Sequence, residues 1–284
     1  MKLSEMPVAS VIQADKFEVT GKLPQEIKVC VLASGSKGNA IYLSDNSTSI
    51  LVDAGLSGIE IQRRMESVHL DPNDLSAVVV SHEHSDHIKG VGIMARRFNL
   101  PVYISEKTRS AALSKLGKIA DLHSFECGTT FQINGFAIHP FSISHDAADP
   151  AGFTLNTSHC KIGIATDLGI ATELVKKHLR GSRLLVLEAN HDPEMLQTGP
   201  YPWPLKQRIK GRSGHLSNYD SGNLLKEILH DDLRHVILAH LSQENNSPEK
   251  AAGVIGPILA KSSIKLEIAR QDQPSQLIKI PNNQ

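Results

Sequence analysis

The sequence predicts one mixed α/β (α+β) domain in which two β-sheets pack face to face and helices cover their outer faces. Two observations lead to this fold class. Short β-branched strands alternate with helical segments in two successive halves of the chain, and no linker or repeat separates the halves. The chain has 284 residues, 40% of them hydrophobic, which is enough for one domain with a sizeable core. Residues 1–26 show no clear periodicity, so we expect an N-terminal extension followed by a single domain over residues 27–284.

Charge, cysteine content and hydropathy limit the classes of function. Lys+Arg and Asp+Glu each number 30, so the formal net charge is zero, whereas a protein that coats DNA non-specifically would usually be basic. The 3 cysteines have no C-x-x-C spacing, which is typical of free thiols in a reducing compartment. No apolar run reaches membrane-spanning length, and the N-terminus lacks the apolar segment of a signal peptide. We therefore expect a cytoplasmic protein without membrane contact.

The first half of the domain alternates strands and helices. Apolar and β-branched runs predict strands at residues 27–33, 40–43, 48–52, 77–80 and 101–104. Helical spacing of apolar residues predicts helices at residues 59–68, 85–97 and 107–116. Three further strands, at residues 119–125, 129–133 and 136–144, are expected to be antiparallel, with Gly128 and the hairpin pair Asn134-Gly135 between them.

The second half continues the alternation. Strands are predicted at residues 152–156, 161–165, 184–187 and 234–239, with two short strands near Leu266 and Leu277. Helices are predicted at residues 172–178, 218–229 and 247–260, and Ser-Pro-Glu at the start of the last one is a typical N-terminus. Several polar residues stand at the ends of strands, namely Asp53, His145, Asp167, Glu188 and His240.

The segment Ser81-His-Glu-His-Ser-Asp-His87 carries the clearest chemical information. It joins a buried strand to a helix, so three imidazoles and a carboxylate can converge on one point outside the sheet. Neutral imidazole and carboxylate suit zinc, manganese or iron. The alternative is a surface histidine cluster without metal, which the dense spacing and the strand-to-helix position disfavour.

This segment resembles the signature of the metallo-β-lactamase fold hydrolases, and further elements of that family follow in order. They are Ile50-Leu-Val-Asp53-Ala-Gly55, His145 in Ser142-Ile-Ser-His145, Asp167 in Ala165-Thr-Asp167-Leu-Gly169, and His240 in Ile237-Leu-Ala-His240. The resemblance implies a four-layer αββα sandwich that holds two divalent metal ions.

The resemblance also implies a ligand set. His82, His84 and His145 would hold one metal, Asp86, His87 and His240 the second, and Asp167 would bridge the two. Asp53 would orient a metal-binding histidine. From the residues alone, Asp53 and Asp167 could instead be helix caps, and His139 is more often an ordinary sheet histidine. Two metals would activate a shared water as hydroxide and grip both oxygens of an in-line displacement.

A second resemblance narrows the reaction class. Glu188, His215 in Gly214-His-Leu-Ser217, and His240 resemble the acid and two histidines of the β-CASP nucleases. The short interval between Asp167 and His240 leaves no room for the large inserted domain of those enzymes. The compact form with Tyr201-Pro-Trp203 looks like the bacterial YycJ (WalJ) subgroup, regarded as 5′→3′ exonucleases that act on DNA. The resemblance makes Asp86, Glu188 and His215 the catalytic candidates.

The residues predicted to contact substrate lie in three places. Lys206, Arg208, Lys210 and Arg212 could neutralise phosphates, or could form a solvated basic helix face; both interpretations stay open. Tyr201 and Trp203 could stack on unpaired bases, although core packing is somewhat favoured for Trp203. Taken alone, the Ser34–Asn39 segment is more often a tight turn than an anion site, but the resemblance implies that Ser36 and Asn39 contact substrate. The segment after Glu188 contributes His191.

The sequence thus predicts a dinuclear metal-dependent phosphodiesterase, specifically a 5′→3′ exonuclease on DNA that is single-stranded or has free ends. The nearest alternative is a small-molecule phosphodiesterase or (thio)ester hydrolase of the same fold, because fold alone does not select the substrate. A non-catalytic binding module is a third hypothesis, and the complete ligand set argues against it.

Overall fold

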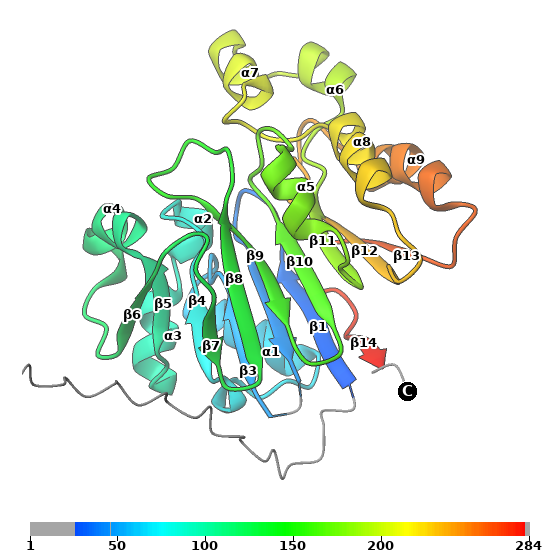
Figure 1. The fold of residues 1–284 in the computed structure, drawn as a ribbon. Helices are drawn as coiled ribbons and strands as arrows, with labels where there is room; N and C mark the ends of the chain where they lie inside the picture. The colour runs from blue at the N-terminus through cyan, green and yellow to red at the C-terminus, as the bar shows by residue number, and fades with distance from the viewer. Residues whose placement is uncertain (1–25, 46, 282–284) are drawn as a thin grey trace, which may run out of the picture.

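A computed structural model describes residues 26–45 and 47–281 of the chain. Two β-sheets pack face to face and helices cover both outer faces, which confirms the expected layers (Figure 1). The predicted extension lies outside the described residues, apart from Glu26, which begins the first strand.

The first sheet has seven strands, four of which run parallel at one side. Its order across the sheet is β14 (Ile278–Pro281), β1 (Glu26–Ala33), β2 (Ala40–Ser44), β3 (Ser49–Val52), β4 (Ala77–Val79), β5 (Val102–Ser105) and β6 (Leu122–Phe125).

The second sheet also has seven strands and likewise ends in four parallel ones. Its order is β13 (Lys265–Ile268), β12 (His235–Ala239), β11 (Leu184–Glu188), β10 (Lys161–Ala165), β9 (Ala151–Asn156), β8 (Phe136–Ser142) and β7 (Phe131–Ile133). The Asn134-Gly135 hairpin between β7 and β8 is confirmed.

Helices cover the outer face of each sheet. On the first sheet lie α1 (Gly58–Ser67), the 3₁₀ turn η1 (Pro72–Asp74), α2 (Ser85–Ile88), α3 (Val91–Phe98) and α4 (Glu106–Leu116). On the second lie α5 (Glu173–Leu179), α8 (Asn218–Ile228) and α9 (Pro248–Leu259). Apolar side chains fill the space between the two sheets and the space between each sheet and its helices. Burial of these three layers is the main stabilising contribution.

The helix predicted over residues 85–97 is divided in two, which corrects the sequence prediction. Gly90 bonds through its N–H to the carbonyl of Ala54 at 2.7 Å, and the carbonyl of Asp86 accepts the N–H of Asn39 at 2.7 Å. The end of α2 therefore bonds to the loop after β3, and its Asp86 carbonyl bonds to the turn before β2. Gly55 in that loop allows the close approach, because a Cβ there would lie 1.6 Å from the carbonyl oxygen of Asp86.

The expected antiparallel trio over residues 119–144 is also corrected. Strand β6 pairs in parallel with β5 at the edge of the first sheet, whereas β7 and β8 belong to the second sheet. Gly128, at φ 92°, lies in the connection that crosses from one sheet to the other. The sequence pattern did not distinguish a turn within a sheet from a crossover between sheets.

The parallel strands of both sheets end at the same end of the sandwich. Three residues that follow these strands adopt left-handed backbone conformations: Asp53 after β3 (φ 62°), Asp167 after β10 (φ 57°) and His240 after β12 (φ 56°). Such conformations are uncommon outside glycine and cluster at functional sites. The turn that each one makes brings its side chain over the end of the sandwich.

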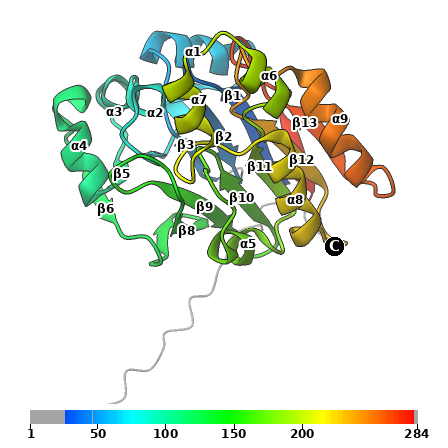
Figure 2. The same cartoon turned by 90° about the horizontal axis from the view of Figure 1, so that it is seen from above.

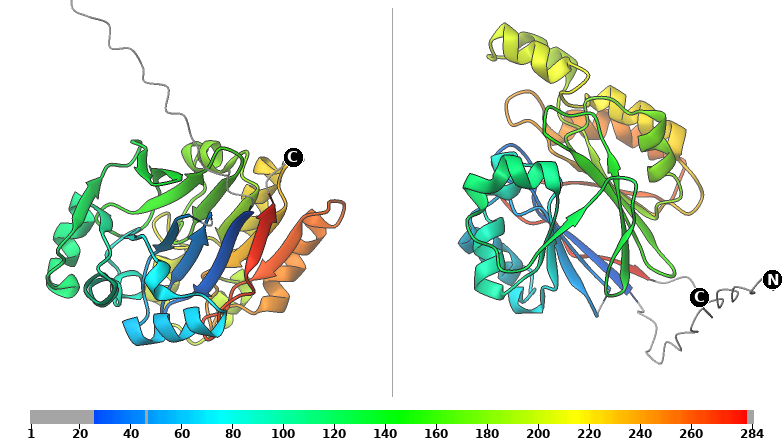
Figure 3. Two further views of the ribbon diagram at one scale, coloured as in Figure 1. Left: turned by 90° about the horizontal axis from the view of Figure 1, so that it is seen from below. Right: turned by 60° about the vertical axis from the view of Figure 1, so that its left-hand side comes forward.

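Two short helices, α6 (Pro193–Thr198) and α7 (Trp203–Lys210), project beyond this end of the sandwich (Figures 1 and 3). The view from above shows α7 crossing over the strand ends (Figure 2). Across residues 26–45 and 47–281, no helix has both the length and the apolar character needed to cross a bilayer.

Candidate metal centre

All seven residues predicted as metal ligands meet at the end of the sandwich. The loop from β4 into α2 supplies His82, His84, Asp86 and His87, while the second sheet supplies His145, Asp167 and His240 from the ends of β8, β10 and β12. Three overlapping groups have ligand atoms within 4.8 Å of one another: His82, His84 and His145; Asp86, His87 and His240; and His82, His87 and Asp167. Asp167 lies beside both sets of histidines, as a bridging carboxylate would.

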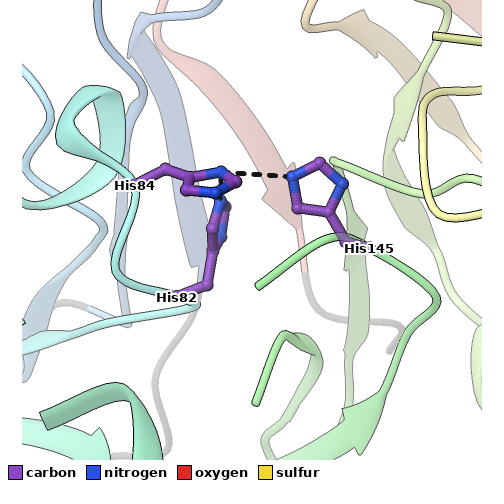
Figure 4. Close-up of side chains that lie close together, drawn as sticks. All are labelled: His82, His84 and His145. Atoms are coloured by element: carbon purple, nitrogen blue, oxygen red, sulfur yellow. Dashed lines mark hydrogen bonds between the residues drawn. The ribbon is translucent and has the colours of Figure 1, made fainter. Parts of the chain in front are cut away.

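The first group contains only imidazoles (Figure 4). His84 Nδ1 lies 3.1 Å from His82 Nε2 and 3.3 Å from His145 Nε2. His82 and His84 come from the first sheet's loop, and His145 faces them from the second sheet. Three nitrogens aimed at one another, with little space between them, form a typical donor set for a borderline divalent cation.

The second group combines imidazole with carboxylate. Asp86 Oδ2 lies 3.7 Å from both His87 Nε2 and His240 Nε2. Asp167 joins the groups, because its Oδ2 lies 3.2 Å from His87 Nε2 and its Oδ1 lies 3.7 Å from His145 Nε2.

The hydrogen bonds of the histidines fit a bound metal pair. The Nδ1 atoms of His87, His240 and His145 face Asp53, Glu188 and the Gly214 carbonyl, at 2.7, 2.9 and 3.2 Å. These outer bonds direct each Nε2 inward, an arrangement typical of metal-binding histidines. His240 Nε2 and Asp167 Oδ2 are buried without any hydrogen-bond partner among the described residues. Buried polar atoms need partners, and two divalent cations would supply them.

Asp53 takes the position predicted for it, beside a ligand histidine. Its Oδ2 accepts from His87 Nδ1 at 2.7 Å, and its Oδ1 accepts the N–H of Ser81 at 2.8 Å. The hydroxyl of Ser81 donates to Asp53 and lies 2.9 Å from His82 Nδ1. Ser57, not Asp53, caps α1. Ser81 was missed by the sequence analysis, although its place directly before His82 was a usable signal.

Glu188 is completely buried and lies behind the centre. Its Oε1 accepts from His215 Nδ1 at 2.8 Å and from His240 Nδ1 at 2.9 Å. Its Oε2 accepts the backbone N–H groups of Leu168 at 2.7 Å and Leu216 at 3.1 Å. Four donors occupy this carboxylate, so the cluster of Asp167, Glu188, His215 and His240 is a hydrogen-bonded network and not a third cation site. Glu188 was predicted to be catalytic; the structure places it behind His215 and His240, to which it is hydrogen-bonded, and it does not line the cavity beside His215.

His215 lies between the two histidine groups. Its ring centroid is 5.1 Å from the ring of His145 and 5.1 Å from the ring of His240. It precedes the cap residue Ser217 of α8, so it is not part of the helix N-terminus. With Nδ1 held by Glu188, the opposite edge of the ring carries Nε2 toward a cavity that His215 lines.

Two residues that the sequence analysis missed hold the backbone of His240 in its left-handed conformation. The Ser34 hydroxyl accepts the His240 N–H at 2.6 Å, and the Asn190 amide donates to the His240 carbonyl at 2.9 Å. Neither position had a recognisable signal, because both contacts join segments far apart in the sequence.

Burial and neighbouring charges shift the pKa values of groups in the centre in opposite directions. Burial lowers the pKa of His240, but the carboxylates of Asp167, Asp86 and Glu188 raise it more, to about 10. Burial raises the pKa of Glu188, but His215 and His240 lower it more, to about 2. Likewise, Asp167 and Asp53 raise the pKa of His87 well above its usual value against the effect of burial. A metal binds the unprotonated imidazole, so cation binding at His87 and His240 would be coupled to proton release.

The turn between β1 and β2 places its two candidates differently. Ser36 is exposed and lines the cavity beside His215. Asn39 is buried, and its amide nitrogen lies 3.0 Å from His87 Nε2 and 3.3 Å from Asp86 Oδ2. Asn39 thus supports the metal centre from inside, which corrects the prediction that it faces substrate.

The basic segment differs most from expectation. Lys206 donates to the carbonyls of Gln197 and Gly199 at 2.7 and 2.8 Å, which ties α7 to the end of α6. Arg208 donates to Asp146 at 2.5 Å. Lys210 and Arg212 are exposed and line a second cavity of ≈ 350 Å³ beside α5 and α8. Within the described chain, only these two of the four basic side chains form no ion pair or backbone bond.

Trp203 and His191 are also placed by the fold. Trp203 is 66% exposed at the start of α7, so the favoured core position is wrong. His191 is 4% exposed and its Nδ1 has no hydrogen-bond partner in the described chain. It does not line the cavity beside His215, so the structure gives no support to its predicted contact with substrate. Burial lowers the pKa of His191 to about 4.

The cavity beside the centre has a volume of ≈ 160 Å³. His215 and His240 lie at one side of it, and α7 covers another side through Leu205, Arg208 and Ile209. Asp146, which directly follows the ligand His145, lines the same cavity. The centre therefore opens onto a small space that a substrate can enter.

Comparison with known proteins agrees with this geometry. Residues 48–241 match the family model described as a β-lactamase superfamily domain. The chain is 39% identical over 231 residues to the exodeoxyribonuclease YycJ of Bacillus anthracis, covering 81% of this chain and 88% of that protein. It is 39% identical over 228 residues to the exodeoxyribonuclease WalJ of Streptococcus pneumoniae, covering 79% of this chain and 85% of that protein.

A solved structure shares the fold at much lower identity. The metallo-β-lactamase fold protein YhfI of Bacillus subtilis superposes with a TM-score of 0.68 at 17% identity, covering 88% of this chain and 99% of that one. The two mixed sheets with outer helices are therefore the metallo-β-lactamase fold.

Proposed function

The chain belongs to the β-lactamase superfamily, and we propose that it is a metal-dependent phosphodiesterase that removes nucleotides from the ends of DNA. The observation that carries the proposal is a complete set of seven metal donors beside a histidine, His215, that is held by a buried carboxylate. The relatives named exodeoxyribonucleases, matched over most of their length, supply the substrate class.

The donor set supports the binding of two divalent cations. His82, His84 and His145 would hold one, Asp86, His87 and His240 the other, and Asp167 both; zinc, manganese and iron suit these donors. When bound, such a pair supplies Lewis acidity toward a phosphate and lowers the pKa of water. Asp86 would take part in catalysis by binding one of the metal ions.

His215 would supply the proton that the departing sugar oxygen needs. Glu188, buried and anionic, accepts the Nδ1–H at 2.8 Å and fixes the ring orientation. With Nδ1 held in this way, the Nε2 edge of the ring faces the cavity, where a general acid would deliver its proton. The same Glu188 oxygen accepts from His240, so one carboxylate aligns the proton donor with a metal ligand.

The proposed polarity is 5′→3′, and the proposed substrate is a strand with a free end, single or within a duplex. Such a substrate places the protein in the compartment that holds DNA, in agreement with the expected cytoplasmic location and with three free cysteines. Trp203 at the start of α7, and Lys210 and Arg212 beside the second cavity, are exposed and available to contact a strand.

The test is digestion of DNA labelled at either end, with protein that has been stripped of metal and then supplied with Mn²⁺ or Zn²⁺. We expect release of labelled mononucleotide from the 5′ label first, and none before metal is restored. Release from the 3′ label first would contradict the polarity. Hydrolysis of a cyclic or chromogenic phosphodiester without any cleavage of DNA would contradict the substrate class and favour a small-molecule phosphodiesterase.

A further inference from the structure

The cavity that adjoins His215 is lined in part by aromatic and aliphatic side chains, which metal-dependent hydrolysis of a phosphodiester does not require. On its α7 side, Tyr201, which precedes the helix, and the apolar Leu205 and Ile209 lie beside Arg208, and the apolar Leu241 lies on the β12 side. His215 and His240 close the end nearest the metal centre. A phosphate needs none of these apolar walls.

We propose that this cavity binds one unpaired nucleobase, that of the nucleotide at the end of the strand. The proposal rests on the proposed function and adds the way in which the enzyme holds its substrate. An aromatic ring with aliphatic side chains is the typical lining of pockets that receive a base taken out of a stack. Every base has an apolar face, so such a lining accepts any sequence.

The size of the cavity favours a single base. Its volume of ≈ 160 Å³ is well below the ~300–1,000 Å³ of pockets that enclose drug-sized ligands. One ring system fits in such a space, whereas a base pair with two backbones does not. A duplex end must therefore separate its last pair before the terminal nucleotide reaches the centre.

The position of the cavity relative to His215 agrees with this assignment. A phosphate between the metal donors and His215 would leave its sugar and base within one nucleotide's length of the centre. The cavity is the space directly beside His215, so the base attached to the reacting nucleotide is the group that meets Tyr201 and Leu205. The hydroxyl of Ser36, which is exposed and lines the cavity, could donate a hydrogen bond to the sugar or the phosphate.

An ion pair holds the α7 wall in place. Arg208 on α7 donates to Asp146, and Asp146 directly follows the ligand His145. This contact joins the apolar wall to the loop that carries a metal ligand. It also neutralises Asp146, whose free charge would repel a phosphate at the mouth of the cavity. Arg208 is thus assigned to positioning the wall, and not to phosphate.

The direct test uses the wild-type protein with Mn²⁺ restored and two oligonucleotides. One has a normal 5′-terminal nucleotide, and the other has a tetrahydrofuran abasic residue at that position. We expect the first cleavage to be about 5- to 150-fold slower for the abasic end, the range that corresponds to one lost base stack. Equal rates on both ends would overturn the proposal without affecting the proposed exonuclease function.

Variants of the wall make the test specific. Leu205→Trp, which fills the cavity, and Tyr201→Ala, which removes its aromatic wall, should slow the normal end and leave the abasic end nearly unchanged. The control is Tyr219→Ala, an exposed aromatic on α8 that does not line the cavity and should change neither rate. Equal losses on both substrates in Leu205→Trp and Tyr201→Ala would overturn the assignment.

Duplex ends provide an independent measurement. A blunt duplex with a mismatched terminal pair should be cleaved faster than one with a terminal G·C pair, because the base must leave its partner before it enters the cavity. Equal rates would contradict single-base entry. No cleavage of any DNA after metal is restored would reject the proposed function, and the nucleobase assignment with it.

Discussion

In the metal centre, side chains such as His87, Asp167 and Glu188 are buried, and their carboxylates and imidazoles neutralise one another across both sheets. In the α6–α7 segment (residues 193–210), Trp203 is 66% exposed, and the basic side chains of Lys206 and Arg208 contact nearby backbone and Asp146. A buried charge without a partner costs far more than an exposed one. In the centre, each buried charged side chain needs a partner of opposite charge, which restricts the residues that can lie there. In the exposed segment, a basic side chain can bond to the protein or remain free, because water solvates it.

The strongest test of the buried region is Asp167→Ala. Removal of the shared carboxylate leaves two cations facing each other without a bridge, so we expect loss of at least one metal equivalent and a fall in activity beyond about 10⁴-fold, more than a general acid contributes. Metal analysis and DNA digestion measure the two effects. Asp231→Ala, which changes an exposed aspartate in a loop, is the control and should keep both. Full metal content with full activity in Asp167→Ala would refute the dinuclear centre.

His215→Ala tests the part of the centre that is not a ligand. We expect both metals to stay bound while the rate on DNA falls by about 10²–10⁴-fold, the usual range for a general acid. The loss should shrink on a nitrophenyl phosphodiester, whose leaving group needs no proton. An equal loss on both substrates would assign His215 to phosphate binding instead.

Glu188→Gln should reproduce most of that loss if Glu188 acts through His215. The amide keeps the size of the side chain but cannot accept from four donors as the carboxylate does. We also expect a changed pH dependence of the rate, which a purely structural role would not produce. An unchanged pH profile would show that Glu188 does not tune His215.

Two double variants compare basic residues that are available to bind phosphate with basic residues that already have partners in the protein. Changing Lys210 and Arg212 to Gln should lower the slope of log affinity against log salt by about 1.4 for single strands, since each phosphate contact contributes about 0.7. Changing Lys206 and Arg208 to Gln should leave the slope nearly unchanged, because those charges already have partners. The measurement is DNA binding by metal-free protein over a range of salt. Equal slope changes would mean that all four residues contact phosphate.

His191 lies where the chain leaves the buried centre for α6, and its effect should appear only in stability. Its pKa is about 4 in the folded protein, below the value near 6.5 expected when unfolded. The unfolded chain therefore takes up a proton first as the pH falls. The free energy of unfolding should be unaffected above pH 6.5 and should decrease by ~3 kcal/mol between pH 6.5 and 4, at ~1.4 kcal/mol per pKa unit.

Denaturant unfolding at several pH values measures this effect, with His191→Gln as the comparison. The variant should lack this component of the acid destabilisation, while the carboxylates common to both proteins contribute equally. Parallel pH profiles for the two proteins would show that His191 is not held neutral in the folded state.

The sequence, through its patterns and its family resemblance, predicted the candidate metal donors and most of the elements that carry them. His82, His84, Asp86 and His87 are close in the chain, so their convergence follows from one strand-to-helix junction. Asp167 and His240 were assigned as donors by the resemblance to the metallo-β-lactamase fold hydrolases, since from the residues alone Asp167 could have been a helix cap. These inferences depend on local spacing and on family motifs, which a sequence displays directly.

Only the tertiary structure decided which partner each remaining polar group has. The division of α2 from α3 depends on bonds to the loop after β3, and the roles of Asn39, Lys206 and Arg208 depend on neighbours supplied by the fold. Ser34 and Asn190 hold His240 across separations of 206 and 50 residues. A hydrogen bond or ion pair is fixed by distance in space, and spacing along the chain does not contain that distance.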